Sequence, residues 1–273
     1  IFLFFPYVPL LICEIVFFSF FPLSIIMIIG LPVHSAGHGK AYIIMKYYLA
    51  PMEGLTTYNF RTNWNRYYGG MDKYFTPFIS NRHMNSRERN DVLPEHNEGM
   101  YTVPQILTNK AEEFLSLAEQ LAGYGYHEVN LNLGCPSGTV VARNRGAGFL
   151  GTPQELETFL DEIFEKCPLE ISIKTRIGME YLDEWAPLLK IYQKFPMKEL
   201  IIHPRLQKEG YQGVPHLEAF AEAADILQCP LCYNGDITSP ETLAHVLEKL
   251  PMVDTVMIGR GILQNPGLLQ QLK

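Results

Sequence analysis

Residues 128–175, EVNLNLGCPSGTVVARNRGAGFLGTPQELETFLDEIFEKCPLEISIKT, contain the alternation of elements that decides the fold. The segments Glu128–Leu133 and Glu170–Thr175 are short apolar runs of the kind that form buried strands. Between them, Thr152-Pro153-Gln154-Glu155 predicts a helix start with a capping box and a proline at the first helical position. One helical face then carries Leu156, Phe159, Leu160, Ile163 and Phe164. A strand, a helix and a second strand in this order predict a parallel pair with a crossover helix.

The same alternation continues on both sides of this segment. The predicted strands are Tyr47–Met52, Tyr74–Ile79, Tyr101–Leu107, Glu128–Leu133, Glu170–Thr175, Glu199–His203, Pro230–Tyr233 and Val253–Ile258. Ser239-Pro240 predicts the start of another amphipathic helix. Eight strand–helix units in series predict a (β/α)8 TIM barrel of the α/β class. The alternative is a doubly wound open sheet, which usually has fewer units and a glycine-rich turn after its first strand.

Composition narrows the class of protein. The chain has 273 residues, a net charge of −7 and 47% hydrophobic residues, which is enough for a large core and excludes a disordered or collagen-like chain. The acidic balance argues against a dedicated DNA-binding protein, although it does not exclude a local basic site. Five cysteines without the spacing of a small disulfide-rich domain indicate a reducing compartment, so we expect a cytoplasmic protein.

The first residues differ from the rest of the chain. Residues 1–32 carry a single charge, Glu14, and Ile15–Leu31 is long enough for a short membrane span. A membrane anchor, a signal peptide and translated sequence upstream of the true start are the three alternatives. The chain begins with Ile, its apolar start contains Pro6, Pro9 and Pro22, and no basic segment precedes it, which favours a non-native extension. We therefore expect residues 1–44 to be a hydrophobic extension and residues 45–273 to be the folded domain, with a membrane tether as the less favoured alternative.

One predicted loop is unusually long. The fourth and fifth strands begin at Glu128 and Glu170, 42 residues apart, and the surplus is the loop 134–148. This loop contains Cys135, Arg143, Arg145 and four glycines. Loops that follow barrel strands form the face where chemistry takes place, and long loops in compact domains are usually functional.

Polar residues and glycines cluster where the predicted strands end. They are Pro51, Met52, Glu53, Gly54, Gln105, Asn130, Asn132, Lys174, Arg176, His203, Arg205, Asn234, Gly235, Asp236, Gly259, Arg260 and Gly261. Eight of the ten arginines follow strands: Arg82, Arg87, Arg89, Arg143, Arg145, Arg176, Arg205 and Arg260. Because the carboxyl ends of barrel strands converge, this distribution predicts a positive end on which a polyanion can dock.

Two turns and one lysine point to an anionic ligand. The turns Asn234-Gly235-Asp236 and Gly259-Arg260-Gly261 follow strands seven and eight, the usual phosphate site of such barrels, although each alone can be ordinary loop chemistry. Lys174 lies inside a predicted strand, where a lysine is costly unless it meets an anion, a carbonyl or an electron-rich ring. The alternative is a lysine that points outward past a helix.

These motifs resemble one family. They are Leu49-Ala50-Pro51-Met52-Glu53-Gly54, Asn132-Leu133-Gly134-Cys135-Pro136, the glycine-rich run to Gly148, Lys174-Thr175-Arg176, His203-Pro204-Arg205, Asn234-Gly235-Asp236 and Gly259-Arg260-Gly261. In this order, from about Met45 to the end of the chain, they resemble the tRNA-dihydrouridine synthases. The resemblance implies an FMN-dependent barrel, an oxidoreductase that reduces the C5–C6 bond of selected tRNA uridines with NADPH or NADH.

The resemblance also implies roles for individual residues. The backbone of Pro51, Met52, Glu53 and Gly54 would lie against the flavin ring, and Gln105, Lys174 and His203 would bind its polar edge. Asn234, Gly235, Asp236, Gly259 and Arg260 would hold the ribityl phosphate. Cys135 would be the general acid and Asn132 would orient the substrate. Arg143, Arg145, Arg176 and Arg205 would contact the tRNA or its target base.

The implied reaction is chemically consistent with these residues. Hydride arriving at C6 of uracil leaves negative charge over C5 and O4, so a proton must reach C5 from the opposite face. A thiol with a pKa near about 8.5 is mostly protonated at neutral pH and is a competent acid. The target base must also leave its stack, as for other enzymes that act on a nucleobase.

Several alternatives remain open at this point. The family continues past the barrel into a small helical domain, so we expect that domain to be truncated here. A flavin barrel acting on free pyrimidines, a non-catalytic remnant and a phosphate-sugar isomerase are rival interpretations. Cys229-x-x-Cys232 lacks a second ligand pair, so we predict no metal. We also infer no obligate protein partner.

Overall fold

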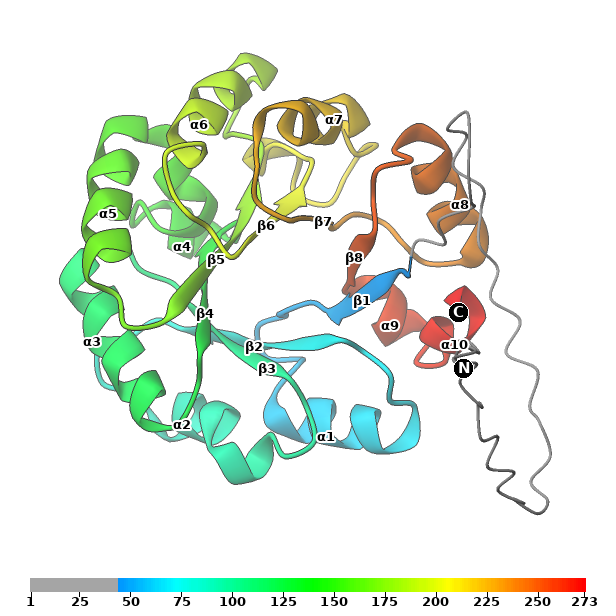
Figure 1. The fold of residues 1–273 in the computed structure, drawn as a ribbon, viewed down its shortest axis with the longest axis horizontal. Helices are drawn as coiled ribbons and strands as arrows, with labels where there is room; N and C mark the ends of the chain where they lie inside the picture. Colours follow the sequence, from blue (N-terminus) through cyan, green and yellow to red (C-terminus); the bar gives the residue numbers. More distant parts are fainter. Residues whose placement is uncertain (1–43) are drawn as a thin grey trace, which may run out of the picture.

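The computed structural model describes residues 44–273, in which eight parallel strands close into a single barrel surrounded by helices (Figure 1). The strands are β1 (Lys46–Leu49), β2 (Lys73–Ile79), β3 (Thr102–Ile106), β4 (Glu128–Leu133), β5 (Glu170–Arg176), β6 (Glu199–His203), β7 (Leu231–Tyr233) and β8 (Thr255–Ile258). Strand β8 pairs with β1, from Lys46 opposite Thr255 to Leu49 opposite Ile258, and this pairing closes the ring. The predicted (β/α)8 barrel is confirmed, and the open-sheet alternative is wrong.

Helices follow the strands and cover the outside of the barrel (Figure 1). The α-helices are α1 (Tyr58–Tyr67), α2 (Ser86–Val92), α3 (Ala111–Gly123), α4 (Gly138–Val141), α5 (Pro153–Lys166), α6 (Trp185–Tyr192), α7 (Leu217–Ile226), α8 (Pro240–Lys249), α9 (Arg260–Gln264) and α10 (Leu268–Leu272). The 3-10 helices are η1 (Pro94–His96), η2 (Gly146–Gly151), η3 (Leu182–Glu184) and η4 (Gln207–Glu209). Within residues 44–273, no helix has the length and apolar character needed to cross a membrane. The expected extension and membrane tether fall on residues that lie outside this described part.

The apolar core has an outer layer and an inner layer. The large outer layer lies between strands and helices, and a small inner cluster, which includes Tyr48, Phe75 and Met257, fills the barrel. At the amino ends of the strands, Lys73 Nζ lies 2.9 Å from Glu128 and 3.4 Å from Glu199, all largely buried. This ionic group and the inner cluster occupy the lower part of the barrel, so the functional cavity lies at the opposite end.

Local predictions at the element ends were met in part. The first strand ends at Leu49, earlier than predicted, and the chain turns at Met52, whose carbonyl accepts from the amides of Leu55 and Thr56. The predicted helix start at Ser239 is confirmed, because its Oγ accepts from the amide of Thr242.

The predicted capping box at Thr152 is wrong. The Thr152 side chain makes no cap hydrogen bond, and its Oγ1 lies 3.0 Å from Asn144 Nδ2 instead. Glu155, the other expected partner of the box, also accepts from Asn144 Nδ2, at 3.2 Å. Both side chains therefore hold the long loop after β4 rather than the first turn of α5.

Candidate functional site

A cavity of about 420 Å³ opens at the carboxyl ends of the strands, and it is lined by residues that lie near the end of, or just after, each of the eight strands. It brings together fourteen predicted site residues: Pro51, Met52, Glu53, Gln105, Asn132, Cys135, Lys174, Arg176, His203, Asn234, Gly235, Asp236, Gly259 and Arg260. Gly54, Arg143, Arg145 and Arg205 are not among the lining residues. The sequence therefore located the cavity, and the structure separates its lining from the residues around it.

Asn132 sets the position of Cys135. The Asn132 Oδ1 atom accepts from the amides of Gly134 at 3.0 Å and Cys135 at 2.9 Å. Its Nδ2 donates to Gln105 Oε1 at 2.8 Å. Both ends of the Asn132 amide thus bond within the protein, its Oδ1 holds the turn that presents the thiol, and its Nδ2 keeps one hydrogen for a ligand in the cavity.

The Gln105 amide belongs to a buried row of polar side chains that crosses three strands. Its Nε2 donates to Asn130 Oδ1 at 2.8 Å, and Asn130 Nδ2 donates to Ser172 Oγ at 3.0 Å. Because an amide nitrogen carries two hydrogens, Gln105 keeps one donor for a ligand in the cavity. The predicted ligand-binding role of Gln105 is therefore compatible with its internal bonds.

Glycines allow the long loop to pack against Cys135. A Cβ atom on Gly146 would lie 2.9 Å from the Cys135 carbonyl oxygen, and one on Gly148 would lie 2.8 Å from the Val141 carbonyl oxygen. The amide of Ala147 donates to that same Cys135 oxygen at 3.1 Å. Close backbone contacts thus explain two of the four loop glycines, Gly146 beside Cys135 and Gly148 beside Val141.

The Cys135 thiol is half-buried and protonated at neutral pH. Burial raises its pKa above the ordinary value, while the positive charges of Arg176 and Lys174 act in the opposite direction. The structure therefore places a neutral thiol in the cavity, next to cations that can stabilise a thiolate once a proton has left.

Lys174 projects into the cavity as an unpaired cation. Its Nζ makes no hydrogen bond or ion pair with any residue in the range 44–273, although the side chain is largely buried. Burial, followed by the nearby Arg176 charge, lowers the pKa of Lys174 to about 8. A buried ammonium without a partner favours an anionic or carbonyl group of a ligand, and the outward orientation considered as the alternative is wrong.

Arg176, which we predicted to contact the substrate, is also bound inside the protein. Its guanidinium is buried and donates to the carbonyl oxygens of Gly134 at 3.0 Å, Leu206 at 2.9 Å and Gly210 at 2.7 Å. Arg176 thus joins the loop after β4 to the loop after β6, although it still borders the cavity.

Arg205 requires a correction, because we predicted that it contacts the substrate and it does not line the cavity. It is fully buried and donates to the carbonyl oxygens of Gln212 at 3.0 Å and Gly213 at 2.6 Å, and to the Asp236 carboxylate. Since most of its donors are committed inside the protein, it holds loops together rather than facing a substrate.

The loop arginines differ in exposure. Arg145 donates to the Ser80 carbonyl oxygen at 3.2 Å and pairs with Glu113 at 3.1 Å, so it fixes the long loop against its neighbours. Arg143 is exposed on the same loop. Only Arg143 of these two remains free to contact a large substrate.

The turns after β7 and β8 meet at the far end of the cavity. Asp236 accepts hydrogen bonds from Arg205 and Arg260, whose charges outweigh burial and lower the pKa of this carboxyl. A Cβ on Gly235 would lie 2.9 Å from Tyr233 Oη, and one on Gly259 would lie 3.3 Å from Ala50 Cβ. The glycines therefore leave backbone amides accessible in a narrow space, as a phosphate site needs.

Tyr211 lines the mouth of the cavity and was not predicted. It is half-exposed, and its ring lies 4.7 Å from the Arg260 guanidinium and 5.4 Å from that of Arg176. Gly210 and Gly213, both with positive φ, flank its segment. An aromatic residue between two glycines after strand six was the signal available in the sequence.

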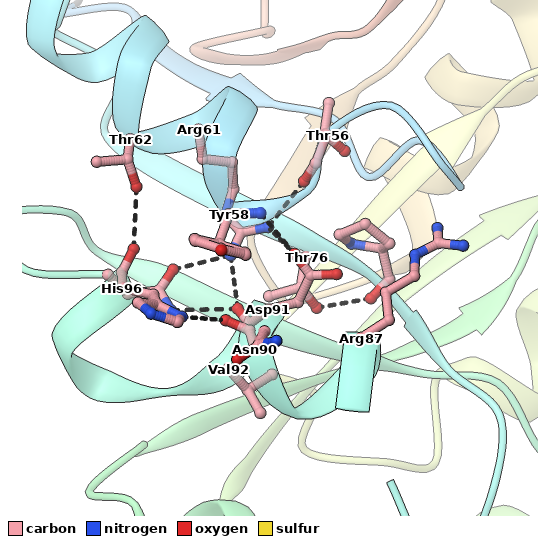
Figure 2. Close-up of polar contacts among 12 residues, drawn as sticks. Thr56, Tyr58, Arg61, Thr62, Thr76, Arg87, Asn90, Asp91, Val92 and His96 are labelled. Carbon is pink, nitrogen blue, oxygen red and sulfur yellow. Dashed lines mark hydrogen bonds and ion pairs between the residues drawn. The ribbon is translucent and has the colours of Figure 1, made fainter. Parts of the chain in front are cut away.

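A buried arginine, Arg61, lies at the centre of a network of polar contacts, as Figure 2 shows. Arg61 of α1 donates to the Thr56 carbonyl oxygen at 2.7 Å, the Asp91 carbonyl oxygen at 2.6 Å and Asn97 Oδ1 at 2.9 Å. It also pairs with the Asp91 carboxylate at 3.5 Å. Thr56 Oγ1 in turn accepts from the Met52 amide at 2.8 Å, so the network holds the turn that lines the cavity.

Comparison with known proteins identifies relatives over most of this region. A family model described as dihydrouridine synthase matches residues 48–273. The tRNA-dihydrouridine synthase B of Pasteurella multocida is 27% identical over 238 residues, covering 86% of this chain and 71% of that protein. A probable tRNA-dihydrouridine synthase of Staphylococcus aureus (strain COL) is 31% identical over 229 residues, covering 80% of this chain and 68% of that protein.

Solved structures share the barrel at low sequence identity. The old yellow enzyme homologue of Zymomonas mobilis has a TM-score of 0.53 at 11% identity, covering 84% of this chain and 87% of that one. Phosphoribosyl anthranilate isomerase of Thermococcus kodakaraensis has a TM-score of 0.52 at 10% identity, covering 84% and 97%. At these identities the likeness establishes the fold alone.

Proposed function

Because the chain belongs to the dihydrouridine synthase family, an oxidoreductase family, we propose that it reduces selected tRNA uridines to 5,6-dihydrouridine with FMN as cofactor and NADPH or NADH as reductant. The observation that carries the proposal is the convergence of Cys135, Lys174, His203 and Arg260 on one cavity. Lys174 and His203 lie in β5 and β6, whereas Cys135 and Arg260 follow β4 and β8, and their shared location supports a common ligand.

The residues present fit a flavin mononucleotide. The cavity volume of about 420 Å³ falls in the range of about 300–1,000 Å³ that is usual for small-molecule sites. The unpaired Lys174 ammonium and the remaining Gln105 donor suit the polar edge of the flavin ring, and the narrow backbone at Gly235 and Gly259 with Arg260 suits a phosphate. When bound, the flavin supplies the hydride for C6 of uracil.

Cys135 would provide the proton for C5. Because its pKa is raised, the thiol would hold its proton until negative charge develops at C5 of the substrate. Transfer of the proton would leave a thiolate beside Arg176 and Lys174. The internal bonds of Asn132 hold the turn that carries this thiol, so the acid is positioned before the substrate arrives.

RNA would approach from the mouth of the cavity. The target base must leave its stack to enter, and Tyr211 at the mouth offers an aromatic face beside the flipped nucleotide. The exposed Arg143 is placed to contact the RNA backbone. The burial of Arg205 and the internal bonds of Arg176 leave fewer arginine donors for this contact than the sequence indicated.

The test compares two cysteine variants of the full chain. We expect Cys135→Ala to bind flavin and oxidise NADPH or NADH while dihydrouridine formation falls by about 100- to 10,000-fold, the usual contribution of a general acid. Cys167→Ala, a partly buried cysteine next to α5 and outside the cavity lining, should form product at the parental rate. Parental rates in Cys135→Ala would refute the acid, and a colourless protein would refute the cofactor. Activity on free uracil or orotate without activity on tRNA would support the free-pyrimidine alternative.

A further inference from the structure

His203 and Arg205 form a buried contact at the end of β6. His203 lines the cavity and is 7% exposed, and Arg205 directly behind it is fully buried. Arg205 Nη1 lies 3.2 Å from His203 Nε2. A guanidinium can only donate hydrogen bonds, so in this contact His203 Nε2 must be the acceptor.

We propose that Arg205 is a positioning residue that holds His203 in the neutral tautomer with its hydrogen on Nδ1. In a neutral imidazole one nitrogen accepts and the other carries the hydrogen. Nε2 is the acceptor, and Nδ1 has no hydrogen-bond partner among residues 44–273. The Nδ1–H group is therefore the donor that His203 offers to a ligand in the cavity.

The Arg205 guanidinium is fixed well enough to impose this state. Its Nε donates to Gln212 O, and its Nη2 donates to Gly213 O and to the Asp236 carboxylate. Three partners from two loops define the plane of the guanidinium, so Nη1 cannot turn away from the imidazole without breaking them. Because Asp236 also compensates its charge, Arg205 can remain buried.

The groups around His203 oppose a second proton on the ring. Burial, followed by the positive charges of Arg176, Lys174, Arg205 and Arg260, holds the pKa of His203 well below its ordinary value. The Tyr211 ring lies 6.1 Å away, and Asp236 reaches His203 only through Arg205. The ring therefore stays neutral at physiological pH, and the contact with Arg205 selects between its two neutral forms.

The consequence for catalysis rests on the proposed function. There, a fixed Nδ1–H would donate to the electron-rich edge of the flavin, and no reorientation of the ring would be needed on binding. The tautomer itself is a property of this chain and can be measured without flavin. Failure of this inference and failure of the proposed function are thus distinguishable.

The direct test is a long-range ¹H–¹⁵N spectrum of the full chain, labelled in histidine nitrogen and prepared without flavin. The His203→Gln variant identifies which signals belong to His203. We expect a pyridine-type resonance for Nε2 and a pyrrole-type resonance for Nδ1, unchanged between pH 6 and pH 8. A pyrrole-type resonance for Nε2 with a pyridine-type resonance for Nδ1, or a doubly protonated ring, would overturn the inference. This test uses the parent protein and does not depend on whether an Arg205 variant folds.

Two arginine variants then test the cause. Arg205→Met should release the tautomer, so that both His203 nitrogens move toward averaged shifts, and the dissociation constant of FMN should rise about tenfold, as for one lost hydrogen bond. Arg260→Met removes the other arginine bound to Asp236 and should leave the tautomer unchanged. A single Nδ1–H tautomer that persists in Arg205→Met would show that another contact fixes the ring and would refute the role of Arg205.

Discussion

Replacing Arg61 by methionine tests whether the network behind the cavity is as important as its geometry indicates. The Arg61 and Asp91 side chains are 0% and 4% exposed, so the substitution leaves a carboxylate in the protein interior without its cation. The carbonyl oxygens of Thr56 and Asp91 and the Asn97 side chain lose a donor at the same time. Breaking a buried ion pair by removing one partner costs about 3–5 kcal/mol.

This cost is large against the stability of a single domain. The free energy of unfolding of a domain is about 5–15 kcal/mol. A loss of about 1 kcal/mol lowers the melting temperature of a protein of this size by about 2–4 °C. We therefore expect Arg61→Met to melt about 6–20 °C below the parent. Since Arg61 also holds Thr56, the variant should bind FMN more weakly under the proposed function.

The pH dependence of this loss identifies its cause. Burial raises the pKa of Asp91 even in the parent, where Arg61 opposes the shift, and removing Arg61 raises the pKa further. An acid whose folded pKa lies above its unfolded value binds more protons in the folded state, so its favourable contribution at low pH is lost as pH rises. The stability deficit of Arg61→Met should be greatest near neutrality and should shrink as the solution is acidified toward the raised pKa.

A second arginine on the same helix provides the control. Arg66 is exposed on α1, and its guanidinium lies 5.7 Å from the Tyr67 ring, with no ion pair or hydrogen bond to another side chain in residues 44–273. Arg66→Met should therefore change stability by less than about 0.5 kcal/mol. The assay is thermal unfolding of the full chains followed by circular dichroism at neutral and mildly acidic pH. Equal melting temperatures for the two variants, or a deficit in Arg61→Met that does not change with pH, would refute the reasoning.

Three further predictions follow from single contacts. Lys174→Met should weaken FMN binding and remove the pH dependence of that binding, because in the parent the affinity for FMN falls as pH rises through the Lys174 pKa of about 8. Titrations followed by flavin fluorescence at several pH values measure the affinity, and a parental pH profile in the variant would contradict the prediction. Asn132→Leu should retain flavin but lower kcat, because the substitution frees the turn that presents Cys135. Flavin content and single-turnover product formation measure the effect, and an unchanged rate of product formation would contradict the prediction. Gly261→Ala should destabilise the fold by about 1–3 kcal/mol, because the new Cβ would lie 2.2 Å from the Ile237 carbonyl oxygen. Urea unfolding measures the free energy of unfolding, and a parental value would contradict the prediction.

The barrel and the location of its site were predictable from the sequence for a physical reason. A parallel strand buried on both faces is a nearly continuous apolar run, and the polar residues just beyond it must lie at one end of the sheet. The periodicity therefore predicted all eight strands and placed fourteen site residues around one cavity. Strand ends were less certain, as at Leu49, because a following proline and turn compete with the strand.

Features that depend on distant partners were not predictable in this way. The residues of a capping box are present at Thr152 and Glu155, but both side chains accept hydrogen bonds from Asn144 on the preceding loop instead. Phe78 reaches the cavity because the register of β2 shifts between Phe75 and Phe78. The only sequence signal for that shift was Pro77, which cannot donate to a neighbouring strand. At such positions the local sequence pattern favours one structure and contacts with distant residues favour another, and here the distant contacts determine the structure.

The arginines show how composition can point to the right end of a fold while several of the same side chains have a structural role there. Eight were expected to form one positive surface, yet Arg176 and Arg205 are buried and bound mainly to backbone carbonyls, and Arg87 and Arg260 are paired with carboxylates. Long loops without regular structure leave many carbonyl groups without partners, and the guanidinium, with five donors, can satisfy several of them at once. Arginine-rich loops around a cavity therefore indicate loops that must be held in place as much as they indicate a polyanionic substrate. In this chain the two roles would meet at His203, where under the proposed inference a loop-holding arginine also determines which ring nitrogen carries the hydrogen.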